Sequence, residues 1–380
     1  MVTRIKSQKI LTPAGAISGY LYFDEKGIIA VGNDELSFDK EIDCGDKYVS
    51  AGFIDLHVHG GVGNDFSECD AAGVASAVDY HLSHGTTTIC PTITSSSYET
   101  MVRSLSNVKE CKEKGMAKGN IFGAHLEGPY FSPAQAGAQP PEFITEPIPG
   151  DYESLISDFG DVIKRWSYAP ERDKDQSFCK YLVDHNVLPS AGHTDAIYDD
   201  VLAAYKAGCN SIAHLYSCTS TITRDHGYRR LGVIESAYLL DDMYVEIIAD
   251  GHHLPLELIG LICKLKDNAK ICLVTDSLKV SGSGEVTGNV GSTKFIVEDG
   301  VCKLPDRSAF AGSIATTDRL VRTVVAAGVP LENAVKMATE NPAALLNIKK
   351  GKLESGYDAD IVIFDENINI EKVIVGGKEV

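Results

Sequence analysis

The apolar positions of the chain between about residues 50 and 350 follow a repeated pattern. Short runs of apolar, β-branched residues alternate with amphipathic stretches of helical length, such as Ala71–His84, Tyr98–Lys114 and Ala196–Ala207. This alternation is typical of βα units around a parallel sheet. Eight apolar runs are present: Gly52–His57, Thr86–Pro91, Ile121–Glu127, Trp166–Ala169, Leu188–His193, Ser211–His214, Tyr244–Ala249 and Ile271–Thr275. They predict an α/β fold with a (β/α)8 barrel over residues 51–350.

The two ends of the chain lack helical periodicity and contain strand-like runs bounded by turn residues. These runs are Thr3–Ile10, Ala16–Phe23, Gly27–Val31, Asp360–Phe364 and Lys372–Val375. We expect residues 1–50 and 351–380 to pair as one small β-sandwich module formed by both termini.

The segment of residues 277–313 is rich in Gly and Ser and interrupts the barrel pattern. It contains two strand-like stretches, Ser292–Asp299 and Val301–Leu304, which predict a β-hairpin insertion or lid. Two further helices are expected after it, near Thr316–Ala327 and Leu331–Leu346.

Length and charge narrow the classes of protein. A single α/β barrel needs about 250 residues, so 380 residues fit one barrel and a smaller module. The net charge of −18 argues against a nucleic-acid partner, because phosphate backbones are bound by clusters of Lys and Arg. The ten cysteines form no CxxC pair and follow no secretory start, so reduced thiols are expected. There is no N-terminal apolar segment and no run of about 18 apolar residues, so we expect a cytoplasmic protein without membrane contact.

Side chains able to bind a metal ion stand at the carboxyl ends of the predicted strands, where an α/β barrel places its active site. There are six of them: His57, His59, Glu127, His193, His214 and Asp276. Imidazole nitrogens together with carboxylates suit zinc and other borderline divalent ions better than magnesium or calcium. The sequence therefore predicts a divalent metal centre, one or two ions per subunit, with zinc as the first expectation and iron, manganese or cobalt as alternatives.

Within residues 52–59 the side chains alternate, so Asp55, His57 and His59 point to the same face of one strand. Two imidazoles on one face can reach one ion, although such a pair alone is more often structural. Asp276 ends an otherwise apolar run and is placed to act as a general base. A metal lowers the pKa of bound water from about 15.7 towards about 7, and a carboxylate can carry the released proton to a leaving amine. A helix cap is the alternative role for Asp276.

Residues 52–59, GFIDLHVH, resemble the opening motif of the amidohydrolase superfamily. Further segments resemble the N-acetylglucosamine-6-phosphate deacetylase family, in the same order and over nearly the whole chain. They are His125–Pro129, Ala169–Glu171, Gly192–Ala196, His214–Tyr216, Ala249–His253, Leu273–Asp276, Ala311–Ser313 and Gly356–Asp360. The resemblance implies a TIM-type metal-dependent hydrolase barrel.

The resemblance also implies roles for individual residues. One ion would be held by Glu127, His193 and His214, and a second by His57 and His59. Asp276 would be the acid/base residue, with His253 in contact with the substrate. The implied reaction hydrolyses the N-acetyl amide of N-acetylglucosamine-6-phosphate to glucosamine-6-phosphate and acetate, a step of amino-sugar catabolism and recycling. The implied assembly is a homodimer in which the partner subunit helps to bind the phosphate.

Three departures from the family pattern concern the substrate site. Gln139 stands where many members have a histidine, and Ser217 and Cys218 replace an Asn-Ala pair. Cys218 is a candidate ligand, but a pocket-lining role is the expected one. The usual phosphate-binding segment is replaced by residues 221–230, whose candidate arginines are Arg224, Arg229 and Arg230. Guanidinium groups match phosphate geometry, but these three could also be ordinary surface charges.

Three alternatives therefore remain open. The chain could deacetylate a different N-acetyl amino sugar, or it could hydrolyse a cyclic amide as dihydroorotases and hydantoinases do. A non-catalytic scaffold on the same barrel is the third. The motif around Glu127 argues against the cyclic-amide alternative, and the complete set of six metal-binding candidates argues against the scaffold.

Overall fold

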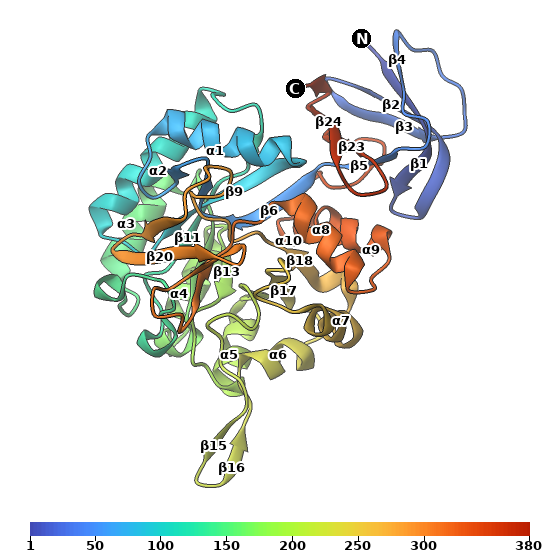
Figure 1. Cartoon of the computed structure of the whole chain (residues 1–380). Helices are drawn as coiled ribbons and strands as arrows, with labels where there is room; N and C mark the ends of the chain where they lie inside the picture. The colour runs from blue at the N-terminus through green and yellow to red at the C-terminus, as the bar shows by residue number, and fades with distance from the viewer.

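The computed structural model describes residues 1–380, and its largest part is a nearly closed barrel of parallel strands (Figure 1). The strands follow the order β6-β9-β11-β12-β13-β14-β17-β18, with the short β10 (Asn120–Ile121) added beside β9. Their bounds are β6 Phe53–Val58, β9 Thr86–Thr94, β11 Ala124–Glu127, β12 Ile163–Tyr168, β13 Leu188–Ala191, β14 Ser211–Ile212, β17 Tyr244–Ile247 and β18 Ile271–Leu273. Each of the eight predicted runs contains or overlaps one of these strands, so the predicted barrel is confirmed.

Burial explains the composition of these strands. All nine residues of β9, TTTICPTIT, are buried, because a parallel strand is covered by side chains on one face and by helices on the other. Just beyond the strand ends, backbone hydrogen bonds join the two edges of the sheet. The Asp276 amide donates to the His57 carbonyl at 2.9 Å, and the His59 amide donates to the Ser277 carbonyl at 2.9 Å. These bonds bring the first and last strands together at the carboxyl end of the barrel.

Helices connect the strands and cover the outside of the barrel (Figure 1). They are α1 Ala71–Ser83, α2 Tyr98–Glu113, α3 Pro149–Phe159, α4 Ser177–Asp184, α5 Tyr198–Ala207, α6 Val233–Leu239, α7 Leu256–Leu265, α8 Thr317–Ala326, α9 Leu331–Met337 and α10 Glu340–Leu345. Short 3₁₀ turns lie at Pro133–Gln135, Pro141–Phe143, Pro170–Arg172 and Asn268–Lys270. None of the helices combines the length and the apolar character that crossing a membrane requires.

The prediction of one helix over Leu331–Leu346 is wrong, since α9 and α10 are separate. Pro342 has no backbone N–H, and in a continuous helix its ring would clash with the carbonyl of Ala338. The chain instead leaves helical geometry at Thr339, where φ is −135° and ψ is −79°.

Both ends of the chain contribute to one mixed sheet beside the barrel (Figure 1). Its strand order is β25-β24-β23-β5-β1-β2-β3, with β4 paired to β1. The bounds are β1 Thr3–Thr12, β2 Gly15–Asp24, β3 Gly27–Gly32, β4 Lys40–Asp43, β5 Tyr48–Ala51, β23 Ile361–Phe364, β24 Ile370–Val375 and β25 Lys378–Glu379. Twelve buried apolar residues form a core of their own here. The termini therefore pair, but as a single sheet, and the sandwich is not confirmed; the boundaries at residues 50 and 351 stay a prediction.

Three smaller sheets interrupt the barrel. Where the sequence predicts a hairpin, the structure has a four-stranded antiparallel sheet, β19-β20-β21-β22. Its strands are Thr287–Val290, Thr293–Glu298, Val301–Lys303 and Phe310–Gly312. A two-stranded hairpin, β15 (Thr223–Asp225) and β16 (Tyr228–Arg230), projects from the body next to α5 and α6 (Figure 1). We call residues 221–230 the arm. A further short pair, β7 (Gly60–Gly61) and β8 (Asn64–Asp65), follows β6.

Candidate metal centre and active site

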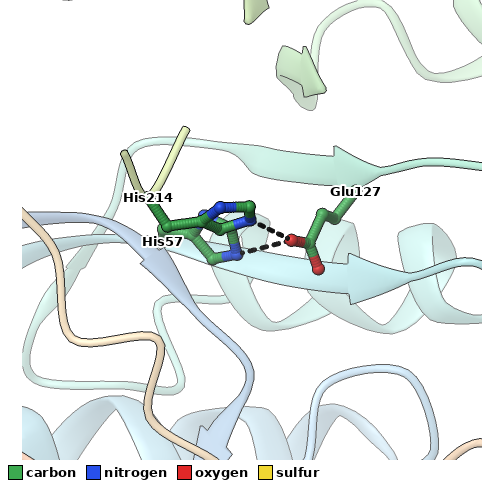
Figure 2. Close-up of side chains that lie close together, drawn as sticks. All are labelled: His57, Glu127 and His214. Carbon is green, nitrogen blue, oxygen red and sulfur yellow. Dashed lines mark hydrogen bonds and ion pairs between the residues drawn. The ribbon is translucent and has the colours of Figure 1, made fainter. Parts of the chain in front are cut away.

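Glu127, the last residue of β11, lies at the centre of a cluster of histidines from other strand ends. Its Oε1 atom is 3.2 Å from His57 Nε2 and 3.1 Å from His214 Nε2, as Figure 2 shows. The His193 Nε2 atom lies 3.2 Å from the same oxygen. All four side chains are buried, although each comes from a different strand or strand end. The barrel therefore assembles three imidazoles around one carboxylate.

A second group of ligand atoms overlaps the first. His59 Nε2 lies 3.2 Å from Glu127 Oε2 and 3.1 Å from Asp276 Oδ1. His57 Nε2 is 3.6 Å from the same Asp276 oxygen. Two triads have all their ligand atoms within 4.8 Å of one another: His57, Glu127 and His214, and His57, His59 and Asp276. The arrangement offers two neighbouring positions for an ion, with Glu127 between them.

The hydrogen bonds of the imidazoles test whether a cation fits. His193 Nδ1 lies 2.9 Å from the Gln135 carbonyl, and His214 Nδ1 lies 3.1 Å from the Ser217 carbonyl. A carbonyl only accepts, so both Nδ1 atoms carry a proton, and each ring in its neutral form turns its Nε2 lone pair towards a Glu127 oxygen. Two acceptors in contact repel unless a cation or additional protons lie between them. Neither buried ring nitrogen of His57 has a hydrogen-bond partner. The donor set therefore fits a borderline divalent ion.

Charge and burial act against each other in the cluster. Burial lowers the pKa of His57, but the Glu127 carboxylate outweighs it and raises the pKa to about 9. Burial also lowers the pKa of His59, yet its hydrogen bonds to Asp276 and Glu127 raise it to about 10. Burial raises the pKa of Glu127, and the surrounding histidines hold that pKa well below its usual value. Without a metal the cluster holds protons, which a cation must displace.

Three of the cluster residues have left-handed backbone geometry, which is uncommon for residues other than glycine. The φ angles are 46° at His193, 29° at His214 and 48° at Asp276. Backbone hydrogen bonds hold this geometry: the Ser313 amide donates to the Asp276 carbonyl at 2.8 Å, and the Ser132 amide donates to the His193 carbonyl at 2.9 Å. Such strain persists where the surroundings determine the conformation, and it concentrates at functional sites.

A cavity of about 310 Å³ opens directly above the cluster. Nine predicted site residues line it: His59, Glu127, Gln139, His193, His214, Ser217, Cys218, His253 and Asp276. His57 is not in the lining and is completely buried. Sequence reasoning missed Tyr216, Val290 and Phe310 in the wall. Tyr216 and Phe310 lie within or beside motifs that could have identified them, whereas Val290 belongs to the inserted sheet.

Two predicted substrate-binding residues are held by hydrogen bonds. Gln139 Nε2 donates to Glu127 Oε2 at 2.6 Å, and Gln139 Oε1 accepts from the Ser95 amide at 3.0 Å. His253 Nδ1 lies 2.9 Å from Asp250 Oδ2, which leaves its Nε2 atom for a ligand. Gln139 therefore fixes Glu127, and His253 presents one defined nitrogen.

The three candidate arginines lie elsewhere. Arg224, Arg229 and Arg230 belong to the arm, whose residues are all exposed, and none of the three lines the cavity. The Arg230 side chain is paired with Asp225 of the same arm at 3.0 Å. One chain alone does not bring these arginines to the cavity.

Comparison with known proteins places this geometry in a family. Residues 48–380 match the model of the amidohydrolase family. The N-acetylglucosamine-6-phosphate deacetylase of Caenorhabditis elegans is 32% identical over 357 residues, covering 90% of this chain and 84% of that protein. The N-acetylgalactosamine-6-phosphate deacetylase of Escherichia coli O157:H7 is 26% identical over 382 residues, 98% of each.

Among solved structures, the chain is similar to a variant N-acetyl-D-glucosamine-6-phosphate deacetylase of Mycobacterium smegmatis in complex with N-acetyl-D-glucosamine-6-phosphate. The identity is 28% and the TM-score is 0.90, over 100% of this chain and 99% of that one. The similarity therefore covers the barrel, the inserted sheet and the terminal sheet together.

Proposed function

The chain belongs to the amidohydrolase family, and we propose that it hydrolyses the N-acetyl amide of N-acetylglucosamine-6-phosphate, giving glucosamine-6-phosphate and acetate. The observation that carries the proposal is the cluster of imidazoles around Glu127 at the floor of the cavity. Relatives that share the whole fold carry the names of deacetylases of this substrate, which supports the choice among amides.

In this proposal Glu127, His193 and His214 hold one divalent ion, and His57 and His59 take part in holding a second, with zinc as the preferred metal. When bound, such an ion supplies Lewis-acid chemistry, acidifying a water molecule and drawing charge from the amide carbonyl. Gln139 keeps the Glu127 carboxylate in place through its 2.6 Å hydrogen bond. The chain contributes the fixed positions of these ligands.

Asp276 is proposed as the general base and then the general acid. Burial raises its pKa, but the hydrogen bond from His59 and the charge of His57 outweigh burial and hold the pKa below its usual value. The carboxylate is therefore ionised at neutral pH and can accept a proton from the attacking water. It then delivers this proton to the amide nitrogen as the C–N bond breaks, so that the amine and acetate leave.

The cavity wall is proposed to hold the sugar. His253 donates or accepts through Nε2, since Asp250 occupies Nδ1. Phe310 packs against the His253 ring with centroids 4.8 Å apart and offers an apolar surface to the sugar. Ser217 and Cys218 line the same cavity, at the start of the segment that leads to the arm.

We also propose a homodimer in which the arm of one subunit brings its arginines to the phosphate at the partner's cavity. The arginines of the arm are exposed, and the arm does not line the cavity of its own chain. Leu239 of α6, the helix that follows the arm in the chain, and Leu261 and Leu265 of α7 are 45–56% exposed, and such apolar side chains suit contact with a second copy. Light scattering should give twice the chain mass, and Leu265→Glu should shift the protein towards the monomer.

The test is acetate release by zinc-loaded protein from a panel of substrates. We expect the highest kcat/KM with N-acetylglucosamine-6-phosphate and a lower value with unphosphorylated N-acetylglucosamine. Equal or faster turnover of N-acetylgalactosamine-6-phosphate would favour the second candidate, which the Escherichia coli relative supports. Inactivity on all three together with hydrolysis of a cyclic amide would contradict the proposal.

A further inference from the structure

A charged pair is completely buried inside the barrel, beneath the metal-binding cluster. Arg165 of β12 and Glu246 of β17 both have 0% side-chain exposure, and Arg165 Nη2 is ion-paired with Glu246 Oε1. Burying two charges costs several kcal/mol per ion before their attraction is counted. The mechanism proposed above uses neither residue, so the pair calls for another explanation.

The hydrogen bonds of the pair leave two polar atoms without a partner, Arg165 Nε and one carboxylate oxygen of Glu246. Arg165 Nη1 donates to the Leu56 carbonyl at 2.7 Å, next to His57 in the chain, and Ser211 Oγ donates to Glu246 Oε1 at 3.4 Å. The other carboxylate oxygen, Glu246 Oε2, has no hydrogen-bond partner. It lies 3.6 Å from His57 Nδ1, which has none either. Closing this gap by about half an ångström would make an ordinary N–H···O hydrogen bond.

The other three histidines of the cluster show what this contact does. The Nδ1 atoms of His193 and His214 face backbone carbonyls, and His59 Nδ1 lies 3.1 Å from Thr94 Oγ1. Each ring therefore has an oxygen at Nδ1, which leaves Nε2 to face Glu127 or Asp276. His57 differs in having a carboxylate at this place. A carboxylate bonded to the far nitrogen of a ligating histidine fixes the ring's tautomer and raises the basicity of the nitrogen that binds the metal.

We propose that Glu246 is a positioning residue for the metal centre. It accepts the Nδ1 proton of His57 and so directs the His57 Nε2 lone pair towards Glu127 and Asp276, where the ion binds. Arg165 holds the carboxylate by Oε1, which leaves Oε2 for His57, and supplies the compensating charge. The proposal rests on the metal-dependent function above, but it concerns metal affinity and not turnover.

The test compares variants by metal binding. Removing Glu246 alone would leave Arg165 buried and uncompensated, which is strongly destabilising, whereas apolar replacement of both partners is often neutral. We therefore choose the double variant Arg165→Met with Glu246→Leu and measure zinc affinity by competition with a chelator. We expect a loss of about 10- to 100-fold with a cooperative thermal transition retained. Ser211→Ala is the matched control: it removes the contacts of this hydroxyl to Glu246 Oε1 and Ser190 Oγ, leaves Glu246 Oε2 facing His57, and should leave the affinity within about twofold.

A second measurement uses the unaltered, zinc-loaded protein. With ¹⁵N-labelled histidine, the His57 ring should show a protonated Nδ1 with a downfield, slowly exchanging proton. A His57 ring protonated on Nε2 overturns the proposal, and so does a folded double variant with unchanged zinc affinity. Failure of the proposed deacetylation would appear as missing acetate release with zinc affinity intact, so the two failures are distinguishable.

Discussion

The metal-binding side chains at the barrel mouth are buried and mutually connected, whereas the three arginines on the arm are exposed. His193 and His214 are each oriented at both ring nitrogens, by a backbone carbonyl at Nδ1 and by the Glu127 carboxylate at Nε2. Arg230 contacts only its own arm, through Asp225. A side chain held from several sides has one position in a single chain, whereas the arm's arginines would acquire a defined position in the proposed dimer. The two regions should therefore respond differently to substitution.

The largest effect is expected at the centre of the connected region. Glu127→Gln keeps the shape of the side chain but removes the charge shared by both ion positions. Loss of several kcal/mol of transition-state stabilisation corresponds to a fall in kcat of roughly a thousandfold, together with a loss of bound metal. Acetate release and metal content on the same sample measure both. Glu285→Gln, an exposed carboxylate on the insertion, is the control and should change neither. Full activity of the Glu127 variant would contradict the assignment of the centre.

The next effect separates proton transfer from metal binding. Asp276→Asn should lower kcat by roughly 100- to 1,000-fold, because the amide cannot accept the proton of the attacking water. The ion position formed by Glu127, His193 and His214 does not include Asp276 and should stay filled. Loss of all bound metal in this variant would show that Asp276 is mainly a ligand.

The strand ends explain how much of this site could be predicted from sequence. A buried parallel strand reads as a continuous apolar run, so a histidine or carboxylate at its end stands out, as Glu127 and Asp276 do. All parallel strands of a barrel deliver these residues to the same mouth. Residues Arg165 and Glu246 also interrupt apolar runs, but nothing local shows that they face each other across the barrel. An ion pair between residues of distant strands is set by the fold, so the sequence of neither strand alone predicts it.

Other features were missed for different reasons. Pro342 indicates the break between α9 and α10, but the apolar positions around it continue with a helical period, so the sequence favoured one helix. The inserted sheet has four strands because short segments such as Phe310–Gly312 become strands only when a neighbour pairs with them. The arm could be recognised as a departure from the family pattern, but its direction depends on packing that the sequence does not encode locally.

The pH dependence of metal binding should also distinguish the two regions. The pKa values of about 9 for His57 and about 10 for His59 mean that both rings carry an extra proton at pH 7 when no metal is bound. Zinc must displace protons, so its apparent affinity should rise with pH and fall as the pH drops below neutrality. The slope should be about tenfold per pH unit for each displaced proton. Competition with a chelator between pH 6 and 8 measures the apparent zinc affinity. An affinity that does not change with pH would contradict the displacement of protons by zinc. Substituting Arg229 on the arm should leave this slope unchanged.

A smaller effect is expected on the arm. Arg229→Ala removes one guanidinium, and a charge-assisted hydrogen bond to phosphate contributes about 1.5–3 kcal/mol. We expect KM for the phosphorylated sugar to rise roughly tenfold, with kcat and metal content unchanged. Kinetics with the unphosphorylated sugar provide the control, because its KM should not move. Equal changes for both sugars would mean that the arm acts on folding or assembly and does not bind phosphate. Arg224→Ala and Arg230→Ala test the other two candidates in the same way.

The smallest effect is expected at Cys218, which lies in sequence between the metal-binding cluster and the arm. Cys218 lines the cavity four residues after His214 and three residues before the arm, and its backbone has a φ of 48°. Its sulfur belongs to neither triad of potential ligands, so it is a wall residue in this geometry. Cys218→Ser keeps the size of the side chain and should change kcat/KM by no more than about twofold, with unchanged metal content. Steady-state kinetics and metal analysis of the variant decide the matter. A loss of bound metal in this variant would instead show that the Cys218 thiol is a metal ligand.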